Sequence, residues 1–343
     1  MAGTMKAWQF RAPGPLDKTL TLYSDVPKPD ETSLGPDDLL VKVAACGLNP
    51  ADYKVQELGI IARAIVPFPK TVGMDLSGEV VAVGSAVSSD DVKPGDKIAG
   101  RVNPLGAAGA LAPYVVVPRS YVAVLTNPQA DVVLASGLAT PALTAYQTIA
   151  PYVEAGRGDK IFINGGSGGV GTCCIQIAKL LGCHVTVSCS TGKVDMCRDL
   201  GADDIIDYKK TASVTAELKK RGREFTLIVD NVGNSPTDLF SSSKSYLGKG
   251  RPYVFVGGNM SFSAVTNMIV AALVPTALGG VRGRFQTFIT KDSPEDLEKL
   301  VTWYAEGKLK ILEEARYGFE EAKTAMQRLH AGGATGKIFV TSE

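Results

Sequence analysis

The stretch "INGGSGGVGTCC", residues 163–174, places five glycines between an apolar run and a segment of helical character. The run that leads into it, "DKIFING", is typical of a buried strand. The segment "GGVGTCCIQIAKLLG" is typical of a helix that ends at Gly182. So many glycines at one strand-to-helix turn indicate that the backbone comes close to something there.

The centre of this stretch fits the pattern G-x-G-x-x-G. Its place between a strand and a helix is the context in which that pattern marks a dinucleotide site. The early glycines would let the backbone approach a pyrophosphate, and Gly171 would let the helix pack closely on the sheet. Free N–H groups at the helix start would face the phosphates. We therefore predict a dinucleotide site, with a purely structural turn as the alternative. Its residues are Gly166, Ser167, Gly168, Gly169, Val170 and Gly171.

The choice of dinucleotide depends on the end of the next strand, where "SCSTGK" covers residues 188–193. An NAD site commonly has an acidic side chain about 20 residues after the glycines, but the first acid here is Asp195. Ser188, Ser190 and Lys193 suit a 2′-phosphate instead, with Lys193 as a point charge. We predict NADP(H) as the cofactor. The alternative for Lys193 is an ordinary solvated lysine at a helix start.

Strands and helices alternate around the glycines, which is typical of a doubly wound parallel sheet. The stretch "DVVLASGLATPALTAYQTI" (131–149) reads as a helical pair broken at Pro141. Ser293 and Pro294, followed by two acids, indicate the start of a further helix. Before about residue 130 the chain is rich in β-branched runs bounded by turn residues. The predicted fold class is α/β, with a β-rich first part.

Composition excludes several classes of protein. The formal net charge is +1, from 36 basic and 35 acidic residues, so nothing favours nucleic acid or an anionic membrane as a partner. The six cysteines form no C-x-x-C pair, which favours a reduced compartment. The N-terminus resembles neither a signal peptide nor a transit peptide, so we expect a cytoplasmic protein.

One uncharged, strongly apolar stretch runs from Pro252 to Val281. A membrane span needs roughly 20 apolar residues with little interruption. Here Pro275, Gly279 and Gly280 interrupt, so we predict a buried strand followed by a helix, not a span. That helix would cover the mouth of a cleft or form a homodimer contact. Its Met260, Phe262 and Met268 are predicted to touch an apolar substrate or a partner subunit.

Six motifs together resemble the medium-chain dehydrogenase/reductase superfamily, in its zinc-free quinone oxidoreductase and enoyl reductase branch. They are "GLNPADYK" (47–54), "VGMDLSGEVVAVG" (72–84), "VKPGDKIAG" (92–100), "GGSGGVG" (165–171), "LGADDIIDY" (200–208) and "GATGKIFV" (333–340). The resemblance runs nearly end to end. It implies a GroES-like β-rich catalytic domain at 1–125 and 291–343, and a Rossmann NADP-binding domain at 126–290.

The resemblance also implies that zinc is absent. Zinc members carry a cysteine at the position of Asn49 and Gly-His-Glu at the positions of Gly73, Met74 and Asp75. Zinc prefers a closed set of Cys, His or carboxylate ligands, and the two histidines, His184 and His330, lie far from these motifs in the sequence. We therefore predict no metal site.

Further site residues follow from the same resemblance. Asn49 and Tyr53 would face the nicotinamide as the catalytic side chains, with Tyr53 donating a proton or a hydrogen bond. A packed aromatic is the alternative for Tyr53. Cofactor contacts are also implied for Thr144, Tyr208, Gly257 and Gly258.

Without zinc, alcohol oxidation lacks its usual Lewis acid. Hydride addition to an activated C=C bond suits such a site, because the substrate's own carbonyl delocalises the developing charge. We predict an NADPH-dependent reductase of apolar unsaturated carbonyl compounds: enones, enals, quinones or enoyl thioesters. The alternatives are a trans-acting enoyl reductase of a fungal biosynthetic cluster and a non-catalytic, crystallin-like NADPH-binding protein.

Overall fold

The computed structural model describes residues 3–222, 224–233, 235–257 and 284–342. The chain divides into two compact units, one of Met1–Leu143 with Lys291–Glu343 and one of Thr144–Thr290. Residues 126–143, which the resemblance assigned to the Rossmann domain, group with the first unit. The reason is that α3 (Val132–Ala135) packs against strands of that unit, and Tyr304 donates a hydrogen bond to the carbonyl of Asp131.

The second unit contains, within its described residues, a six-stranded sheet in which all neighbouring strands are parallel. The strands are β9 (Lys160–Asn164), β10 (His184–Cys189), β11 (Asp204–Asp207), β12 (Leu227–Asp230), β13 (Pro252–Phe255) and β14 (Arg284–Thr287). Their order is β11-β10-β9-β12-β13-β14. Numbered from β9, this is the 3-2-1-4-5-6 order of a Rossmann fold. The order reverses between β9 and β12, at the strand that carries the glycine-rich turn.

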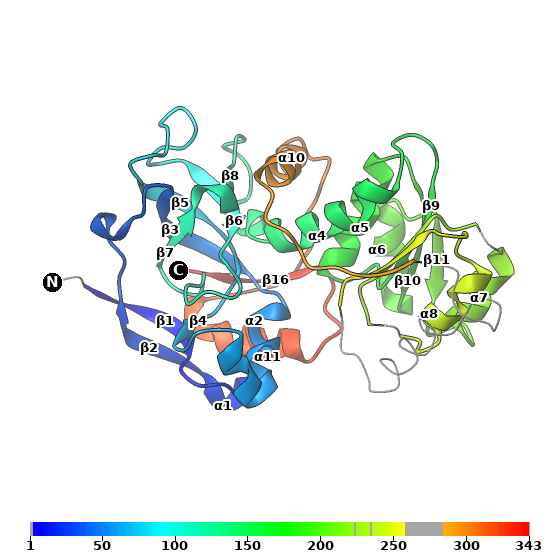
Figure 1. Cartoon of the computed structure of the whole chain (residues 1–343), viewed down its shortest axis with the longest axis horizontal. Coiled ribbons are helices and arrows are strands. Elements are labelled where there is room, and N and C mark those ends of the chain that lie inside the picture. The colour runs from blue at the N-terminus through cyan, green and yellow to red at the C-terminus, as the bar shows by residue number, and fades with distance from the viewer. Residues whose placement is uncertain (1–2, 223, 234, 258–283, 343) are drawn as a thin grey trace. The chain divides into compact units, whose positions relative to one another are not determined.

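Helices cover both faces of this sheet, with α5 and α6 on one side and α7 and α8 on the other (Figure 1). They are α5 (Gly169–Leu180), α6 (Val194–Asp199), α7 (Val214–Arg221) and α8 (Leu239–Ser242). The central strand β9 is apolar because it is buried on both faces: Ile161, Phe162 and Ile163 have no exposed surface. Gly182 and Gly201 follow α5 and α6 with positive φ, as expected for glycines that end helices.

The first unit is built on two sheets. Its described strands are β1 (Thr4–Phe10), β2 (Leu20–Pro27), β3 (Asp38–Gly47), β4 (Lys70–Thr71), β5 (Asp75–Val83), β6 (Lys97–Arg101), β7 (Tyr114–Pro118), β8 (Val122–Val124), β15 (Glu313–Tyr317) and β16 (Lys337–Thr341). A three-stranded sheet has the order β2-β1-β4, and a seven-stranded sheet has the order β15-β16-β3-β5-β6-β8 with β7 paired to β3. Strand β16, from the end of the chain, pairs with β3 (Figure 1).

The short helices of the first unit are α1 (Leu16–Thr19), α2 (Ala51–Lys54), α3, α10 (Pro294–Ala305) and α11 (Ala322–His330). The start of α10 is as predicted: Pro294 is its first residue, and the Ser293 hydroxyl accepts a hydrogen bond from the Asp296 N–H at 3.3 Å. The predicted break at Pro141 is wrong. Helix α4 (Ala139–Ile149) includes Pro141 in its first turn, where no intrahelical N–H is needed.

Four predicted site residues, Gly258, Met260, Phe262 and Met268, lie outside the described residues, as does most of the apolar stretch that begins at Pro252. Among the helices that are described, none is long and apolar enough to cross a membrane.

Candidate functional site

The glycine-rich turn of the second unit joins β9 to α5. A Cβ at Gly171 would lie 2.1 Å from the carbonyl oxygen of Gly165, so the helix can pack this closely only with glycine there. A Cβ at Gly166 would lie 2.9 Å from the Val187 side chain on β10. Around Gly168, by contrast, no described atom lies within 4 Å of a Cβ position. Two glycines thus serve packing, and a third presents open backbone.

A buried polar network below this turn was missed by the sequence reading. Ser188 was predicted for a 2′-phosphate, but its hydroxyl donates to Asn164 Oδ1 at 2.6 Å and accepts from the Gly165 N–H at 3.0 Å. Asn164 in turn donates to Asp230 Oδ1 at 2.9 Å, and Asp230 accepts from the Tyr253 hydroxyl at 2.7 Å. Ser188 therefore ties β10 to the turn. Two signals in the sequence could have indicated this network. They are an asparagine at the end of β9 and an aspartate at the end of β12, both at the carboxyl edge of a parallel sheet.

Three predicted residues follow neighbouring strands at the carboxyl edge of the sheet: Ser190 and Lys193 after β10, and Tyr208 after β11. Ser190 follows β10 and precedes the short 3-10 helix η5 (Thr191–Lys193). Tyr208 follows β11, is 48% exposed, and donates its N–H to the Cys189 carbonyl at 3.1 Å. Asp207, which the sequence reading did not consider, also ends at this edge. Its Oδ1 accepts a hydrogen bond from the Lys209 N–H at 3.0 Å, while Oδ2 is buried without a hydrogen-bond partner among the described residues. Burial acts to raise the pKa of Asp207, but hydrogen bonds from Thr191 and from the Lys209 N–H outweigh it, and the pKa is lowered.

The remaining predicted cofactor contacts are spread over the second unit. Ser167, Gly169 and Val170 are half-buried at the turn and the start of α5. The buried Thr144 hydroxyl lies 2.6 Å from Thr290 Oγ1. Gly257 follows β13 with φ of 147°, in a region that favours glycine. Cys174 on α5 has no exposed surface and packs in the interior, and this burial raises the pKa of its thiol.

A second polar turn, Gly47–Lys54, lies in the first unit between β3 and α2. The Asn49 amide is held at both ends: Nδ2 donates to Asp75 Oδ2 at 2.8 Å and to the Gly47 carbonyl at 3.1 Å, while Oδ1 accepts from Lys337 Nζ at 2.9 Å. An ammonium only donates and a carboxylate only accepts, so these partners fix the orientation of the amide. Both amide hydrogens of Asn49 are thereby used inside the protein.

Asp75 and Lys337 are the centre of this network. Asp75 has no exposed surface, and Lys337 is 4% exposed with its Nζ 3.7 Å from Asp75 Oδ2. Thr140 supplies two hydrogen bonds to the other carboxylate oxygen, Oδ1, at 3.1 Å from its N–H and 2.5 Å from its hydroxyl. Lys337 also donates to the Leu48 carbonyl at 2.7 Å. A buried acid is therefore paired and hydrogen-bonded on all sides, as a charge in such a place requires.

Asp52 belongs to the same turn. Its Oδ2 accepts from the Asn49 N–H at 2.7 Å, and its own N–H donates to the Asn49 carbonyl at 3.0 Å. The pKa of Asp52 is raised to about 7. Burial is the largest cause and the neighbouring Asp75 adds to it, while the Asn49 N–H, Lys337 and Lys70 act in the opposite direction. Asp52 was not singled out from the sequence.

Tyr53, the other predicted catalytic side chain, is 5% exposed. Its ring lies 4.8 Å from that of His330 on α11, measured between centroids, and His330 Nε2 lies 3.1 Å from Glu57 Oε1. Burial, then Glu57 and Asp52, raise the pKa of Tyr53. The phenol therefore stays protonated at neutral pH and is a hydrogen-bond donor, not an anion.

In the described structure, the residues at the positions that hold zinc in related enzymes do not bring together a set of zinc-binding groups. Asn49 is fully hydrogen-bonded, Met74 offers only a thioether, and the Lys337 ammonium already lies beside Asp75. Zinc in proteins is bound by thiolate, imidazole and carboxylate groups in a closed set. Across the part of the chain that the structure describes, no group of three or more His, Cys, Asp or Glu residues could hold a metal ion.

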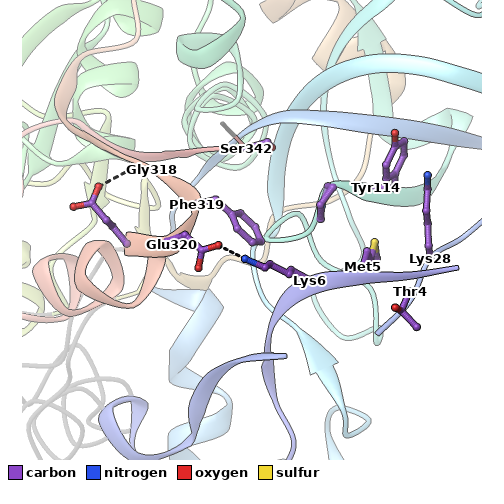
Figure 2. A pocket seen from close by; sticks show the side chains of 11 residues that line it. Thr4, Met5, Lys6, Lys28, Tyr114, Gly318, Phe319, Glu320 and Ser342 are labelled. Atoms are coloured by element: carbon purple, nitrogen blue, oxygen red, sulfur yellow. Dashed lines mark hydrogen bonds and ion pairs between the residues drawn. The ribbon is translucent and has the colours of Figure 1, made fainter. Parts of the chain in front are cut away.

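A wide groove of about 690 Å³ also opens on the first unit, lined by residues that include Met5, Tyr114 and Phe319. Lys6 and Glu320 form an ion pair of 2.6 Å across part of it (Figure 2). None of the predicted site residues that the structure describes lines this groove.

Comparison with known proteins agrees with this architecture. A family model described as an alcohol dehydrogenase GroES-like domain matches residues 35–127, and one described as a zinc-binding dehydrogenase matches residues 200–340. The trans-enoyl reductase pgmF of Aspergillus terreus is 44% identical over 345 residues, which cover 98% of this chain and 96% of that protein. The chloroplastic quinone-oxidoreductase homolog of Spinacia oleracea is 31% identical over 93% of each chain.

Among solved structures, the quinone oxidoreductase from Coxiella burnetii matches with a TM-score of 0.82 and 28% identity, over 99% of this chain and all of that one. The predicted α/β fold, a GroES-like part combined with a Rossmann-type parallel sheet, is confirmed. The chain belongs to the medium-chain dehydrogenase/reductase superfamily, in its quinone oxidoreductase and enoyl reductase branch.

Proposed function

We propose that this protein is an NADPH-dependent reductase that adds hydride to the activated C=C bond of apolar unsaturated carbonyl compounds, without zinc. The observation that carries the proposal is the turn at Asn49. The position that holds a metal ligand in zinc-dependent relatives is here an amide locked between Asp75 and Lys337. Such a turn offers no Lewis acid for an alcohol, whereas an activated alkene carries its own electron-withdrawing carbonyl.

The family uses a nicotinamide nucleotide, and the glycine-rich turn fits one. Gly168 leaves the backbone open, and α5 begins at Gly169 with no side chain capping its N–H groups. These groups and the helix dipole suit a pyrophosphate. When bound, the nicotinamide supplies the hydride. The residues of this chain bind and orient it, with Gly166, Ser167, Gly168, Gly169, Val170, Gly171, Thr144 and Gly257 as the proposed contacts.

The proposed preference for NADPH over NADH rests on three residues at the edge of β10 and β11: Ser190, Lys193 and Tyr208. A lysine beside a serine and an exposed tyrosine suits the extra phosphate. Asp207 at the same edge could oppose that phosphate. Its Oδ1, however, accepts from the Lys209 N–H within its own turn, and its Oδ2 is buried, so the carboxylate is turned into the protein.

Within the first unit, Asn49 and Tyr53 have different proposed roles in the reaction. Because both Asn49 amide hydrogens are used, Asn49 acts by holding the shape of the turn and not by donating to the substrate. Tyr53 keeps its proton and is the proposed hydrogen-bond donor to the carbonyl oxygen of the substrate. Met260, Phe262 and Met268 remain the proposed apolar contacts of that substrate.

A narrower activity, enoyl reduction in partnership with a synthase, is favoured by one observation: the trans-enoyl reductase of Aspergillus terreus is 44% identical across nearly the whole of both chains. An enoyl thioester is itself an activated alkene, so the same site would serve both substrates. A non-catalytic NADPH-binding protein remains the contrasting possibility.

The test is a steady-state assay of NADPH oxidation after dialysis against a chelator. The substrates are 2-alkenals, enones, quinones and a short enoyl thioester. We expect saturable turnover of at least one alkene class, with no stoichiometric zinc by elemental analysis and no loss of rate on chelation. Tight NADPH binding without turnover of any substrate would favour the non-catalytic alternative. About one zinc per chain, with activity lost on its removal, would overturn the zinc-free mechanism.

A further inference from the structure

Two buried ionisable side chains in the first unit have no part in the function proposed above. Asp52 on α2 is 5% exposed, and Lys70 on β4 is 6% exposed. They line the same small cavity, together with Ala51, Gly73, Met74, Val102 and Pro104. The cavity has a volume of about 10 Å³, which is the space of roughly one water molecule.

The two groups influence each other without forming a close ion pair in the described structure. The Lys70 ammonium donates to the Gly106 carbonyl, and Asp52 Oδ2 accepts from the Asn49 N–H. Burial lowers the pKa of Lys70 to about 8, and Asp52 opposes that shift. Burial raises the pKa of Asp52 to about 7, and Lys70 opposes that shift. Both groups therefore exchange protons near neutral pH, unlike a surface aspartate or lysine.

Asp52 and Lys70 differ from the neighbouring Asp75 and Lys337 in their hydrogen-bond partners. Asp75 is saturated by Thr140, Asn49 and Lys337, so it has no oxygen left for another donor. Asp52 has one strong donor, the Asn49 N–H, and faces a cavity whose other walls are mostly apolar. A water placed there would find a carboxyl group and an ammonium group as partners, which are the polar neighbours that a buried water requires.

We propose that Asp52 and Lys70 form a buried proton reserve that shares one water in the cavity beside Met74 and supplies the proton that completes reduction of the alkene. The inference rests on the function proposed above. It also follows from the position of Asp52, which is hydrogen-bonded to Asn49 and adjacent in sequence to Tyr53. Neither side chain touches the substrate. Both act through the shared water.

The chemistry balances as the addition of one hydride and one proton. Hydride from the nicotinamide forms a C–H bond at the β-carbon, and the C=C electron pair moves to give an enolate. A proton from the shared water then forms the C–H bond at the α-carbon. Asp52 or Lys70 returns a proton to that water, and the pair regains its proton from solvent. The nicotinamide is oxidised by two electrons and the alkene is reduced by two.

The experiment follows kcat of the full-length protein with NADPH and an enone between about pH 6 and 9, where the pair titrates. The variants are Asp52→Asn and Lys70→Met, with Lys97→Met, an exposed lysine on β6, as the matched control. Loss of the ammonium makes Asp52 harder to ionise, so the alkaline fall of kcat should move to higher pH by about one unit in Lys70→Met. Loss of the carboxylate should move it to lower pH by about one unit in Asp52→Asn.

These opposite shifts are what a merely structural pair would not produce. Other charged or ionisable groups facing Asp52 are Asp75 on β5, Lys337 on β16 and Cys46 on β3, and all three are unchanged in both variants. We also expect kcat of Asp52→Asn to fall roughly 100-fold near pH 8, with NADPH affinity unchanged. Asp52→Glu should recover most of that rate, because it restores a carboxyl group.

The outcomes are distinguishable. A wild-type protein that reduces no alkene overturns the proposed function, and this inference with it. A wild-type protein that reduces alkenes while both folded variants keep its pH profile overturns the inference alone. If Lys70→Met does not fold, Lys70→Gln is measured in its place. Should neither fold, the profile of Asp52→Asn decides: an unchanged alkaline limb contradicts the proton reserve.

Discussion

The two polar turns of this protein are built in opposite ways. The glycine-rich turn of the second unit offers mainly backbone: Gly168 faces open space, and Gly171 lets α5 approach the turn. The Asn49 turn of the first unit is made of buried side chains, with Asn49, Asp75 and Lys337 linked by hydrogen bonds and a charge pair. A backbone site depends on local geometry, whereas the side-chain site depends on residues that come from distant parts of the chain.

This difference predicts how each turn responds to substitution. A backbone site should be sensitive to added volume, and to the position at which it is added. The side-chain network should be sensitive to loss of any partner, because a buried group left without its partner costs the full desolvation penalty. The four predictions below test this contrast.

The largest effect is expected at Lys337. Lys337→Met would leave the fully buried Asp75 charged without its ammonium partner and the Asn49 carbonyl oxygen without its donor. We expect a loss of about 3–5 kcal/mol in the free energy of unfolding, measured by urea denaturation. Lys42→Met, an exposed lysine on β3, is the control and should change stability by less than about 0.5 kcal/mol. Equal stability of the two variants would mean that the network does not hold the turn.

The second effect concerns pH and Asp52, whose pKa burial raises to about 7. Between about pH 4 and 7 the unfolded chain has released this proton and the folded protein still binds it, so wild-type stability should fall as pH rises through that window. Asp52→Asn cannot titrate there. Relative to it, the wild type should lose up to about 4 kcal/mol from pH 4 to 7. Parallel stability curves for the two proteins would show that Asp52 is not buried as an acid.

The third effect compares two glycines of one turn. A Cβ at Gly171 would lie 2.1 Å from a backbone oxygen, so Gly171→Ala should lower stability by about 3 kcal/mol. Gly168→Ala meets open space and should leave stability nearly unchanged. It should nevertheless weaken NADPH binding by about 1.4 kcal/mol, or ten-fold, if the backbone approaches the phosphates there. The assumed approach is wrong if calorimetry finds normal NADPH affinity in Gly168→Ala.

The fourth effect concerns the edge of β10. Lys193→Ala should weaken NADPH binding by about 1.5–3 kcal/mol, by removal of a charged contact, and should leave NADH binding nearly unchanged. Lys219→Ala on α7, an exposed lysine, serves as the control. Wild-type protein that binds NADPH and NADH equally would remove the basis for this preference.

The same contrast explains what could be predicted from the sequence. The strand, glycine turn and helix around residue 170 have local signals, and their arrangement in the Rossmann order is as expected. The N-terminal cap of α10 at Ser293 was also predicted, because a capping pattern spans only a few residues. The predicted helix break at Pro141 was placed at the wrong residue, because proline is tolerated in the first turn of a helix.

The Asn49 network could not be derived in the same way. Asp75, Thr140 and Lys337 are separated from Asn49 by 26 to 288 residues. Asp75 and Lys337 reach Asn49 because β3 pairs with β5 and β16, and Thr140 reaches Asp75 from the start of α4. Lys70 and Asp52 carry no local sign that they will be buried together. Ser188 was assigned to a phosphate because it lies in the acid-free segment at the end of the strand, but only the tertiary structure shows its hydroxyl donating to Asn164.

The most direct test of the central claim, hydride addition to an activated alkene, is the fate of deuterium from NADPH labelled at the transferable C4 position. The protein is incubated with labelled NADPH and an enone or enal that it turns over, and the product is analysed by mass spectrometry and NMR. The account predicts a saturated ketone or aldehyde with one deuterium at the β-carbon and a solvent-derived hydrogen at the α-carbon. Deuterium at the carbonyl carbon of an allylic alcohol, with the C=C bond intact, would contradict it.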